Sequence, residues 1–418
     1  MKKLFMIAAC VAVAGFTSCS SDDEPVNAYN STTSESSGET PIMLSMSKAG
    51  MEVTTRGTGA VGDTDNKWRG EKLNVYMLDK SSFELAVGYD GTPLFENAEI
   101  TAPSSTDSDN TFADYGLPKY YPMSGNFNFF IYHADDANTV APSLNSTGDQ
   151  YVLPITIDGS QDLMIAKADM PTAQKNAFAT SVGTENAERY YSAYSARRKI
   201  GFDGNENEIG IQPHFQLQHL LSRLVFYVEP TSKGVSDKAQ DSEGRKTGVT
   251  IESIEILNVN TKAEFIVAWK GATPTNYLIV DETSKSDIAL QEKVAGQTEA
   301  HTLVPFTPLQ PIWDETNNCG LSTRVGESLM LFPASEYKLK INMTQTPHYD
   351  ENGAPEIVRF THYQTLKVPG VSTKFEAGKQ YKVLFKVYGA EKNIIDLELT
   401  PWEDGDVIEA EFDKREEE

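Results

Sequence analysis

The stretch Pro213-His-Phe-Gln-Leu-Gln-His-Leu-Leu-Ser-Arg-Leu-Val-Phe-Tyr-Val228 decides the fold class, because its apolar residues alternate as in a β-strand. One face of this strand holds Phe215, Leu217, His219 and Leu221, and the other holds Leu224, Phe226 and Val228. The apolar face therefore changes near Leu220 and Leu221. A strand changes its buried face when it bends, bulges or leaves one hydrophobic core for another. The pattern predicts a domain boundary near Gln212.

The rest of the chain from Pro41 onward also has a period of two, as in Val249–Leu257 and Ile394–Leu399. Asn352-Gly353 lies between two alternating runs and predicts a β-hairpin. We find no sustained helical period, and 418 residues suit two domains plus a tether. The sequence predicts an all-β fold with two β-sandwich domains in tandem, over residues 41–211 and 212–418.

The segment Asp169–Asn205 departs from this pattern, because it carries Ala, Gln, Glu and Arg at the density of a helix. Two interpretations stay open. The segment either contains a short helix or is a long surface insertion, and long insertions are often functional.

The overall charge excludes some partners. The formal net charge is −24, which repels nucleic acid and anionic lipid. Cysteine occurs only at Cys10, Cys19 and Cys319. If Cys10 is removed with a leader and Cys19 is acylated, no disulfide within the chain can form.

The N-terminus has the features of a bacterial lipoprotein signal. Lys2 and Lys3 precede an apolar run, Leu4–Phe16, which is too short to span a bilayer. Phe16-Thr-Ser-Cys19 then resembles a lipobox, so residues 1–18 are expected to be the signal peptide and Cys19 to carry acyl chains such as palmitate. An ordinary secretory signal is the alternative. The acidic and Ser/Thr-rich residues 19–40 are expected to be a flexible tether.

After the tether, Ile42, Leu44 and Met46 alternate with polar or exposed positions and predict a first strand. This strand is followed by Val53-Thr-Thr-Arg56-Gly57. The prediction for the first strand is that these three side chains share one buried face.

We find no catalytic constellation, and we expect no metal and no cofactor. His214 and His219 are five residues apart on a strand, so their side chains point to opposite faces and cannot share a metal. His219 is better interpreted as a hydrogen-bonded core histidine. Asp63–Lys67 lacks the ligand pattern of a calcium loop. The candidate sugar-stacking residues are Trp68, Trp269, Trp313 and Trp402.

Several stretches together resemble the fimbrillin-like proteins, or type V pilins, of Bacteroidetes. They are the leader ending at Cys19; Thr54-Thr-Arg56; Asp162-Leu-Met; Phe215–Leu224; Leu331-Phe-Pro333; Phe375-Glu-Ala-Gly-Lys-Gln-Tyr381; and a last strand closed by Pro401-Trp402. This resemblance implies two transthyretin-like β-sandwich domains. It also implies a precursor anchored to the outer membrane through Cys19 and carried to the cell surface.

The resemblance further implies that an arginine-specific protease cuts between Arg56 and Gly57. The cut would free the first strand, with Ile42, Leu44 and Met46 as its plugs, and another pilin subunit would fill the groove with its own strand. The tail Asp404–Glu418 is the expected donor in a stalk subunit, but its last six residues are all charged. Stalk and tip roles therefore both stay open.

The leading hypothesis is a structural and adhesive pilus subunit, with host or bacterial surface ligands as further partners. The alternative is a glycan-binding surface lipoprotein of a polysaccharide-uptake system. A hydrolase on a β-sandwich is the least supported, since no catalytic residues stand out.

The N-terminal residue of the protein isolated from cells tests these expectations. A lipidated Cys19 is expected for an anchored or uncut precursor, and Gly57 for a polymerised pilin. N-terminal sequencing with mass spectrometry distinguishes the two. A terminus at another small residue near position 19, without lipid, would contradict the lipoprotein interpretation.

Overall fold

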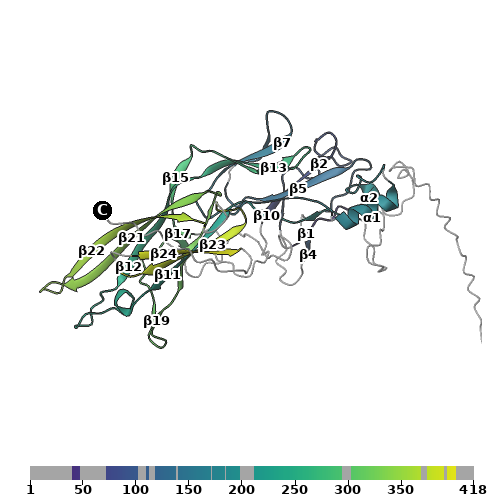
Figure 1. Ribbon diagram of the computed structural model, residues 1–418. Helices are drawn as coiled ribbons and strands as arrows, with labels where there is room; N and C mark the ends of the chain where they lie inside the picture. Colours follow the sequence, from purple (N-terminus) through teal and green to yellow (C-terminus); the bar gives the residue numbers. More distant parts are fainter. Residues whose placement is uncertain are drawn as a thin grey trace, which may run out of the picture.

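The computed structural model is built mainly of β-strands, which confirms the predicted all-β class. Figure 1 shows an elongated molecule, with β21 (Glu336–Tyr349) and β22 (Pro355–Lys367) toward one end and α1 (Thr172–Val182) and α2 (Ala193–Arg197) toward the other. The structure describes residues 40–47, 72–101, 110–112, 118–137, 140–170, 172–183, 185–197, 211–293, 303–368, 374–389 and 393–401.

A five-stranded sheet, called here the central sheet, organises the N-terminal half. Its strands in order are β10 (Gln218–His219), β8 (Met164–Lys167), β5 (Phe127–His133), β2 (Lys72–Asp79) and β3 (Ala98–Thr101). All seven residues of β5 are buried. Along β2, Val75 and Met77 belong to one core and Tyr76 and Leu78 to another. Because alternate residues point to opposite faces, both faces of this sheet need a cover.

The outer sheet covers one face. Its strands in order are β14 (Leu278–Val280), β13 (Lys262–Trp269), β7 (Gln150–Thr156) and β6 (Ser143–Leu144). The ring of Phe130 packs against Trp269 with centroids 4.7 Å apart, and Tyr132 packs against Phe265 at 5.8 Å. β13 follows Gln212 in the chain but pairs with β7, which precedes it, and β14 pairs with β13. Strands from both predicted domains thus share one sheet, and the domain boundary near Gln212 stays a prediction.

The small sheet and the two helices lie against the other face. The small sheet is β4 (Asn110–Phe112), β1 (Ser45–Ser47) and β9 (His214–Phe215). Phe178 of α1 and Tyr191 before α2 are fully or almost fully buried, and Tyr191 packs edge-on against Phe129 at 5.9 Å. Of the two interpretations of Asp169–Asn205, the structure therefore has the helical one, within residues 172–197. Residues 198–205 lie outside the described residues.

The C-terminal sandwich consists of two four-stranded sheets. The first is β20 (Thr323–Leu331), β11 (Ser222–Pro230), β23 (Lys379–Val387) and β24 (Asn393–Pro401), and the second is β15 (Lys285–Ala289), β12 (Val249–Asn260), β21 and β22. Their facing side chains form one core, in which the rings of Phe226 and Phe385 stack 6.0 Å apart.

The hairpin predicted at Asn352-Gly353 is confirmed, since β21 and β22 pair antiparallel around it. Gly353 has a φ of +80°, a backbone conformation that glycine adopts without strain. Asp350 closes the turn, because its backbone N–H donates to Ala354 and its carboxylate accepts from Asn352. The remaining short elements are β16 (Gln291–Lys293), β17 (Leu303–Pro305), β18 (Trp313–Asp314), β19 (Cys319–Gly320) and a 3₁₀ turn, η2 (Lys233–Val235).

The change of face in Pro213–Val228 predicted a bend, a bulge or a move from one core to another, and the structure shows that the stretch contributes to three cores. Phe215 packs beneath the small sheet, Leu221 packs between the central and outer sheets, and Leu224 packs inside the C-terminal sandwich. The stretch breaks into β9, β10 and β11, each of which joins a different sheet. This stretch is therefore one of the places where the chain crosses between the two halves of the molecule.

Two buried histidine–carboxylate pairs lie where β5, β8 and β10 meet. His219 Nδ1 is 2.8 Å from Asp162 Oδ2, which agrees with its interpretation as a core histidine. His133 Nδ1 is 2.8 Å from the Lys72 carbonyl and its Nε2 is 2.8 Å from Asp135 Oδ1. Both ring nitrogens of His133 face acceptors, as an imidazolium requires. Burial alone would lower the pKa of His133, but the Asp135 carboxylate outweighs it and raises this pKa to about 9.

This pair predicts a loss of stability in alkali. A folded-state pKa of about 9, above the ordinary 6.5, means that the stabilisation is complete below about pH 6.5 and is lost as the pH rises through about 9. The loss is on the order of 3 kcal/mol at most. Urea unfolding at several pH values measures it.

His133→Gln should flatten this part of the pH profile. His348→Gln, at an exposed histidine near the β21–β22 turn, is the matched control and should leave the profile unchanged. An unchanged slope in His133→Gln would contradict the assignment.

Candidate functional site at strand β1

β1 is the middle strand of the small sheet. It pairs antiparallel with β4, where Met46 is opposite Thr111, and parallel with β9, where Met46 is opposite Phe215. The residues just before β1 are bonded as well, because Ile42 N–H donates to the Lys119 carbonyl at 2.8 Å. The segment is thus held along its length by main-chain bonds to parts of the chain far away in sequence.

The side chains of this segment alternate between core and solvent, as the sequence predicted. Ile42 and Leu44 are 0 % and 1 % exposed, and they pack in the core between the small and central sheets. Met43 between them is 37 % exposed. Burying an aliphatic side chain of this size stabilises by about 1.5–3 kcal/mol. The predicted burial is thus found for Ile42 and Leu44, the side chain of Met46 lies outside what the structure describes, and the role of all three as plugs stays a prediction.

Gln212 holds the main chain of this segment through its side-chain amide. Its Oε1 accepts a hydrogen bond from Met43 N–H at 3.0 Å, and its Nε2 donates to the Pro41 carbonyl at 3.1 Å. One residue further on, the Pro213 carbonyl accepts from Ser45 N–H at 3.1 Å. Three main-chain polar groups of the segment are thus satisfied by two consecutive residues.

His214 contacts the side chain of the same segment. Its Nδ1 is 2.9 Å from Ser45 Oγ, on the face of the small sheet that points away from the core. Burial lowers the pKa of His214, so the ring is neutral at neutral pH. A neutral ring nitrogen can accept the hydroxyl proton of Ser45.

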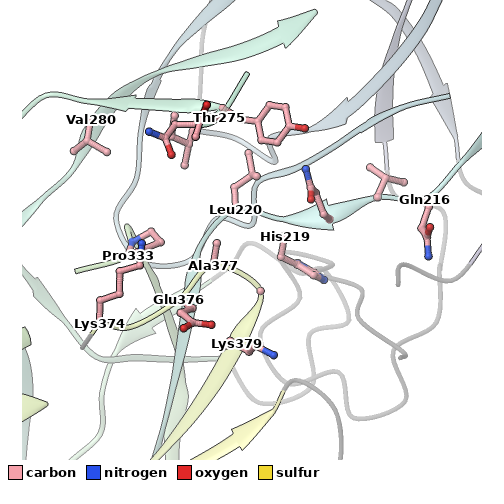
Figure 2. Close-up of a pocket in the computed structure, with 16 residues that line it drawn as sticks. Gln216, His219, Leu220, Thr275, Val280, Pro333, Lys374, Glu376, Ala377 and Lys379 are labelled. Atoms are coloured by element: carbon pink, nitrogen blue, oxygen red, sulfur yellow. The ribbon is translucent and has the colours of Figure 1, made fainter. Parts of the chain in front are cut away.

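A separate cleft of about 950 Å³ lies between the two halves of the molecule. Figure 2 shows Gln216, His219 and Leu220 on one side of it and, on the other, Lys374 and Glu376 from the turn before β23 and Lys379 from the start of that strand. Its lining mixes amide, charged and apolar side chains and contains no arrangement of a nucleophile with a base.

In the described residues, no group of three or more His, Cys, Asp or Glu side chains could hold a metal ion. Neither described helix is long and apolar enough to cross a membrane. The geometry that stands out is instead the tightly bonded first strand.

The comparison with protein families decides the identity. The model of the family described as fimbrillin-like matches residues 55–402. The chain belongs to the fimbrillin-like family. The match begins after β1, so the family likeness covers the two halves of the molecule and leaves the first strand outside it.

Solved structures similar to this fimbrillin-like chain cover most of its length. A candidate cell adhesion protein from Bacteroides uniformis is 15 % identical, with a TM-score of 0.42 and coverage of 87 % of this chain and 98 % of that one. The fimbrial anchor protein Mfa2 from Porphyromonas gingivalis is 11 % identical, with a TM-score of 0.32 and coverage of 87 % and 98 %. A fimbrial assembly protein from Parabacteroides distasonis is 10 % identical, with a TM-score of 0.34 and coverage of 89 % and 99 %. No curated protein matches the chain.

Several residues predicted to be functional in this fimbrillin-like chain lie outside the described residues. They are Cys19, Arg56 and Gly57, together with the tail Asp404–Glu418. Lipidation, cleavage and the donor role of the tail therefore remain predictions.

Sequence reasoning missed Gln212 and the role of His214. It considered His214 only as a metal ligand with His219, and it treated Gln212 only as a boundary marker. A weak signal was present in Gln212-Pro213, since proline cannot donate a ladder hydrogen bond and a neighbouring amide can replace it.

The buried side chain of the first strand predicts a stability effect. Leu44→Ala should lower the free energy of unfolding by about 2–5 kcal/mol, because it leaves a cavity beneath the small sheet. Met43→Ala, at the exposed neighbouring position, is the matched control and should change the stability by less than about 1 kcal/mol. Urea unfolding of the uncut protein measures both variants, and equal losses would mean that the strand is not seated as described.

Proposed function

We propose that this fimbrillin-like protein is a structural subunit of a surface pilus, and that a protease removes β1 so that a strand of another subunit can replace it. The observation that carries the proposal is twofold. Ile42 and Leu44 are buried in the core, and β1, which follows them directly, is paired with a strand on each side. We assign the chain no catalytic role.

Removal of β1 would leave a slot that another strand can refill. It would expose the apolar side chains beneath Ile42 and Leu44 and leave the carbonyls of Lys119 and Pro213 without their partners. Buried polar groups and apolar surface left open are both costly. A donor strand restores the ladder and the packing together.

The chain offers a place for the cut. Arg56 lies in the segment between β1 and β2, so cleavage after it would sever the covalent link between the first strand and the rest of the protein.

Anchoring and assembly follow in order. Cys19 would hold the precursor in the outer membrane by its acyl chains. Once cut, subunits joined by donated strands form head-to-tail contacts that do not close, and such contacts give a fibre. The donor is a strand of another pilin subunit, and adhesion to host or bacterial surface ligands is the expected use of the fibre.

The glycan-binding alternative has less support. Trp269 is 1 % exposed and lies in the core, so it cannot serve as a sugar platform. Trp313 is half-buried, while Trp68 and Trp402 lie outside the described residues.

Cleavage of the full chain by an arginine-specific protease tests the proposal. The expected product starts at Gly57 and forms polymers, which size-exclusion chromatography and electron microscopy detect. Arg56→Ala should block both cleavage at this site and polymerisation. Arg69→Ala, which removes the other arginine between β1 and β2, is the matched control and should behave like the wild type. Polymers formed equally by Arg56→Ala would refute the processing step.

A further inference from the structure

Gln212 occupies the place of a missing strand residue. In a parallel pair, a residue donates its N–H to a carbonyl of the neighbouring strand. Its own carbonyl accepts from the N–H that lies two residues further along that same neighbouring strand. Pro41 and Met43 offer such a carbonyl and N–H, and the Gln212 amide bonds both, at 3.1 and 3.0 Å. The side chain therefore continues the ladder that β9 begins.

The main chain beside Gln212 cannot supply these bonds. Pro213 has no N–H, so it offers only the carbonyl that Ser45 N–H already uses. The N–H of Ile211 points elsewhere, to the Ser195 carbonyl at 3.4 Å. The regular pairing of β1 with β9 starts only at Ser45 opposite His214. On the side of β9, the residues just before β1 therefore depend on the Gln212 side chain for these hydrogen bonds.

Within residues 41–47, the Gln212 amide bonds main-chain atoms, the Met43 N–H and the Pro41 carbonyl. Its oxygen faces an N–H and its nitrogen faces a carbonyl, so the amide has one orientation in which both bonds form. The Tyr121 hydroxyl lies 3.5 Å from the same oxygen and favours that orientation. Any extended strand in the same register presents the same two groups, so this contact fixes register without restricting sequence.

His214 adds a contact that does depend on sequence. Its ring lies 2.9 Å from Ser45 Oγ, whereas the neighbouring Leu44 points into the core. A strand with an apolar residue at the Ser45 position would leave the half-buried ring nitrogen without this partner, and an unmet polar group is costly.

We propose that Gln212 and His214 together select the strand that fills the β1 position. Gln212 sets the register of the incoming main chain, and His214 favours a serine or threonine one residue after the second apolar plug. The preferred occupant is a strand of another subunit with the pattern of Ile42–Ser45: apolar, any residue, apolar, hydroxyl. The exchange of strands rests on the proposed function, but the contacts themselves exist in the uncut chain.

Hydrogen exchange of the uncut, full-length protein tests the Gln212 contact. Gln212→Ala should speed the exchange of the Met43 amide by about tenfold, since it removes two hydrogen bonds of ordinary strength. Gln212→Asn, whose amide is one methylene too short to reach both groups, should act in the same direction. Gln216→Ala, at an exposed glutamine four residues on, is the matched control. Unchanged exchange in both Gln212 variants would overturn the register role.

Peptide binding to the Arg56-cut protein, with the first strand removed, tests the His214 contact. The probe is a fluorescent peptide with the sequence of residues 40–47, measured by anisotropy. Replacing the serine at position 45 by alanine should weaken binding about fivefold, and threonine should restore it. In the His214→Ala protein the serine and alanine peptides should bind equally. A serine preference that survives in His214→Ala would overturn the selectivity.

The two failures can be told apart. If the cut protein binds none of the peptides, strand exchange is wrong, and the proposed function fails with it. The selectivity of His214 is then decided in the uncut chain, where Ser45→Ala should speed exchange of the β1 amides and Ser45→Thr should not. Equal effects of the alanine and threonine changes would overturn the role of the hydroxyl.

Discussion

The central sheet is apolar on both faces, and the rest of the N-terminal half depends on that constraint. Its strand β5 is buried at all seven positions, so neither face can meet water. One face is covered by β7 and β13, and the other by β1, β9 and the helices. The second cover includes β1, a strand of three residues that is the first strand among the described residues. A short cover on an apolar sheet is the feature that makes replacement of a strand physically reasonable.

The two covers differ in how they are held. β13 is part of a long continuous path between β12 and β14 and pairs with β7 over most of its length, so it cannot leave without opening the C-terminal sandwich. The chain segment that contains Arg56 is what links β1 covalently to β2 and to the strands that follow it. β1 and the residues just before it are held by the buried side chains of Ile42 and Leu44, by main-chain bonds and by the Gln212 and His214 contacts, each of about 1–3 kcal/mol. An incoming strand with two apolar side chains and the same main-chain and hydroxyl groups can supply an equal stabilisation free energy.

Buried polar side chains also connect strands, through hydrogen bonds and ion pairs as well as apolar packing. Asp162 pairs with His219 of β10 and donates its N–H to Asp135, which pairs with His133 of β5. Buried polar groups are stable only when each has a hydrogen-bonding partner, so these contacts tie β5, β8 and β10 together where they meet. β10 is followed directly by β11, so the chain passes here from the central sheet into the C-terminal sandwich.

Four features could be predicted from the amino-acid sequence alone: the all-β class, the hairpin at Asn352-Gly353, the change of face in Pro213–Val228 and the burial of Ile42 and Leu44. Alternation of apolar and polar residues indicates which side chains of a strand are buried, and it does so without showing which other element they pack against. Two contacts could not be predicted in this way: the pairing of β13 with β7, and the hydrogen bond from Met43 to Gln212, which lies 169 residues away. The sequence does not show which strands pair, because many strands have the same alternation of apolar and polar residues. The pairs are selected by side-chain packing between segments that are far apart in the sequence.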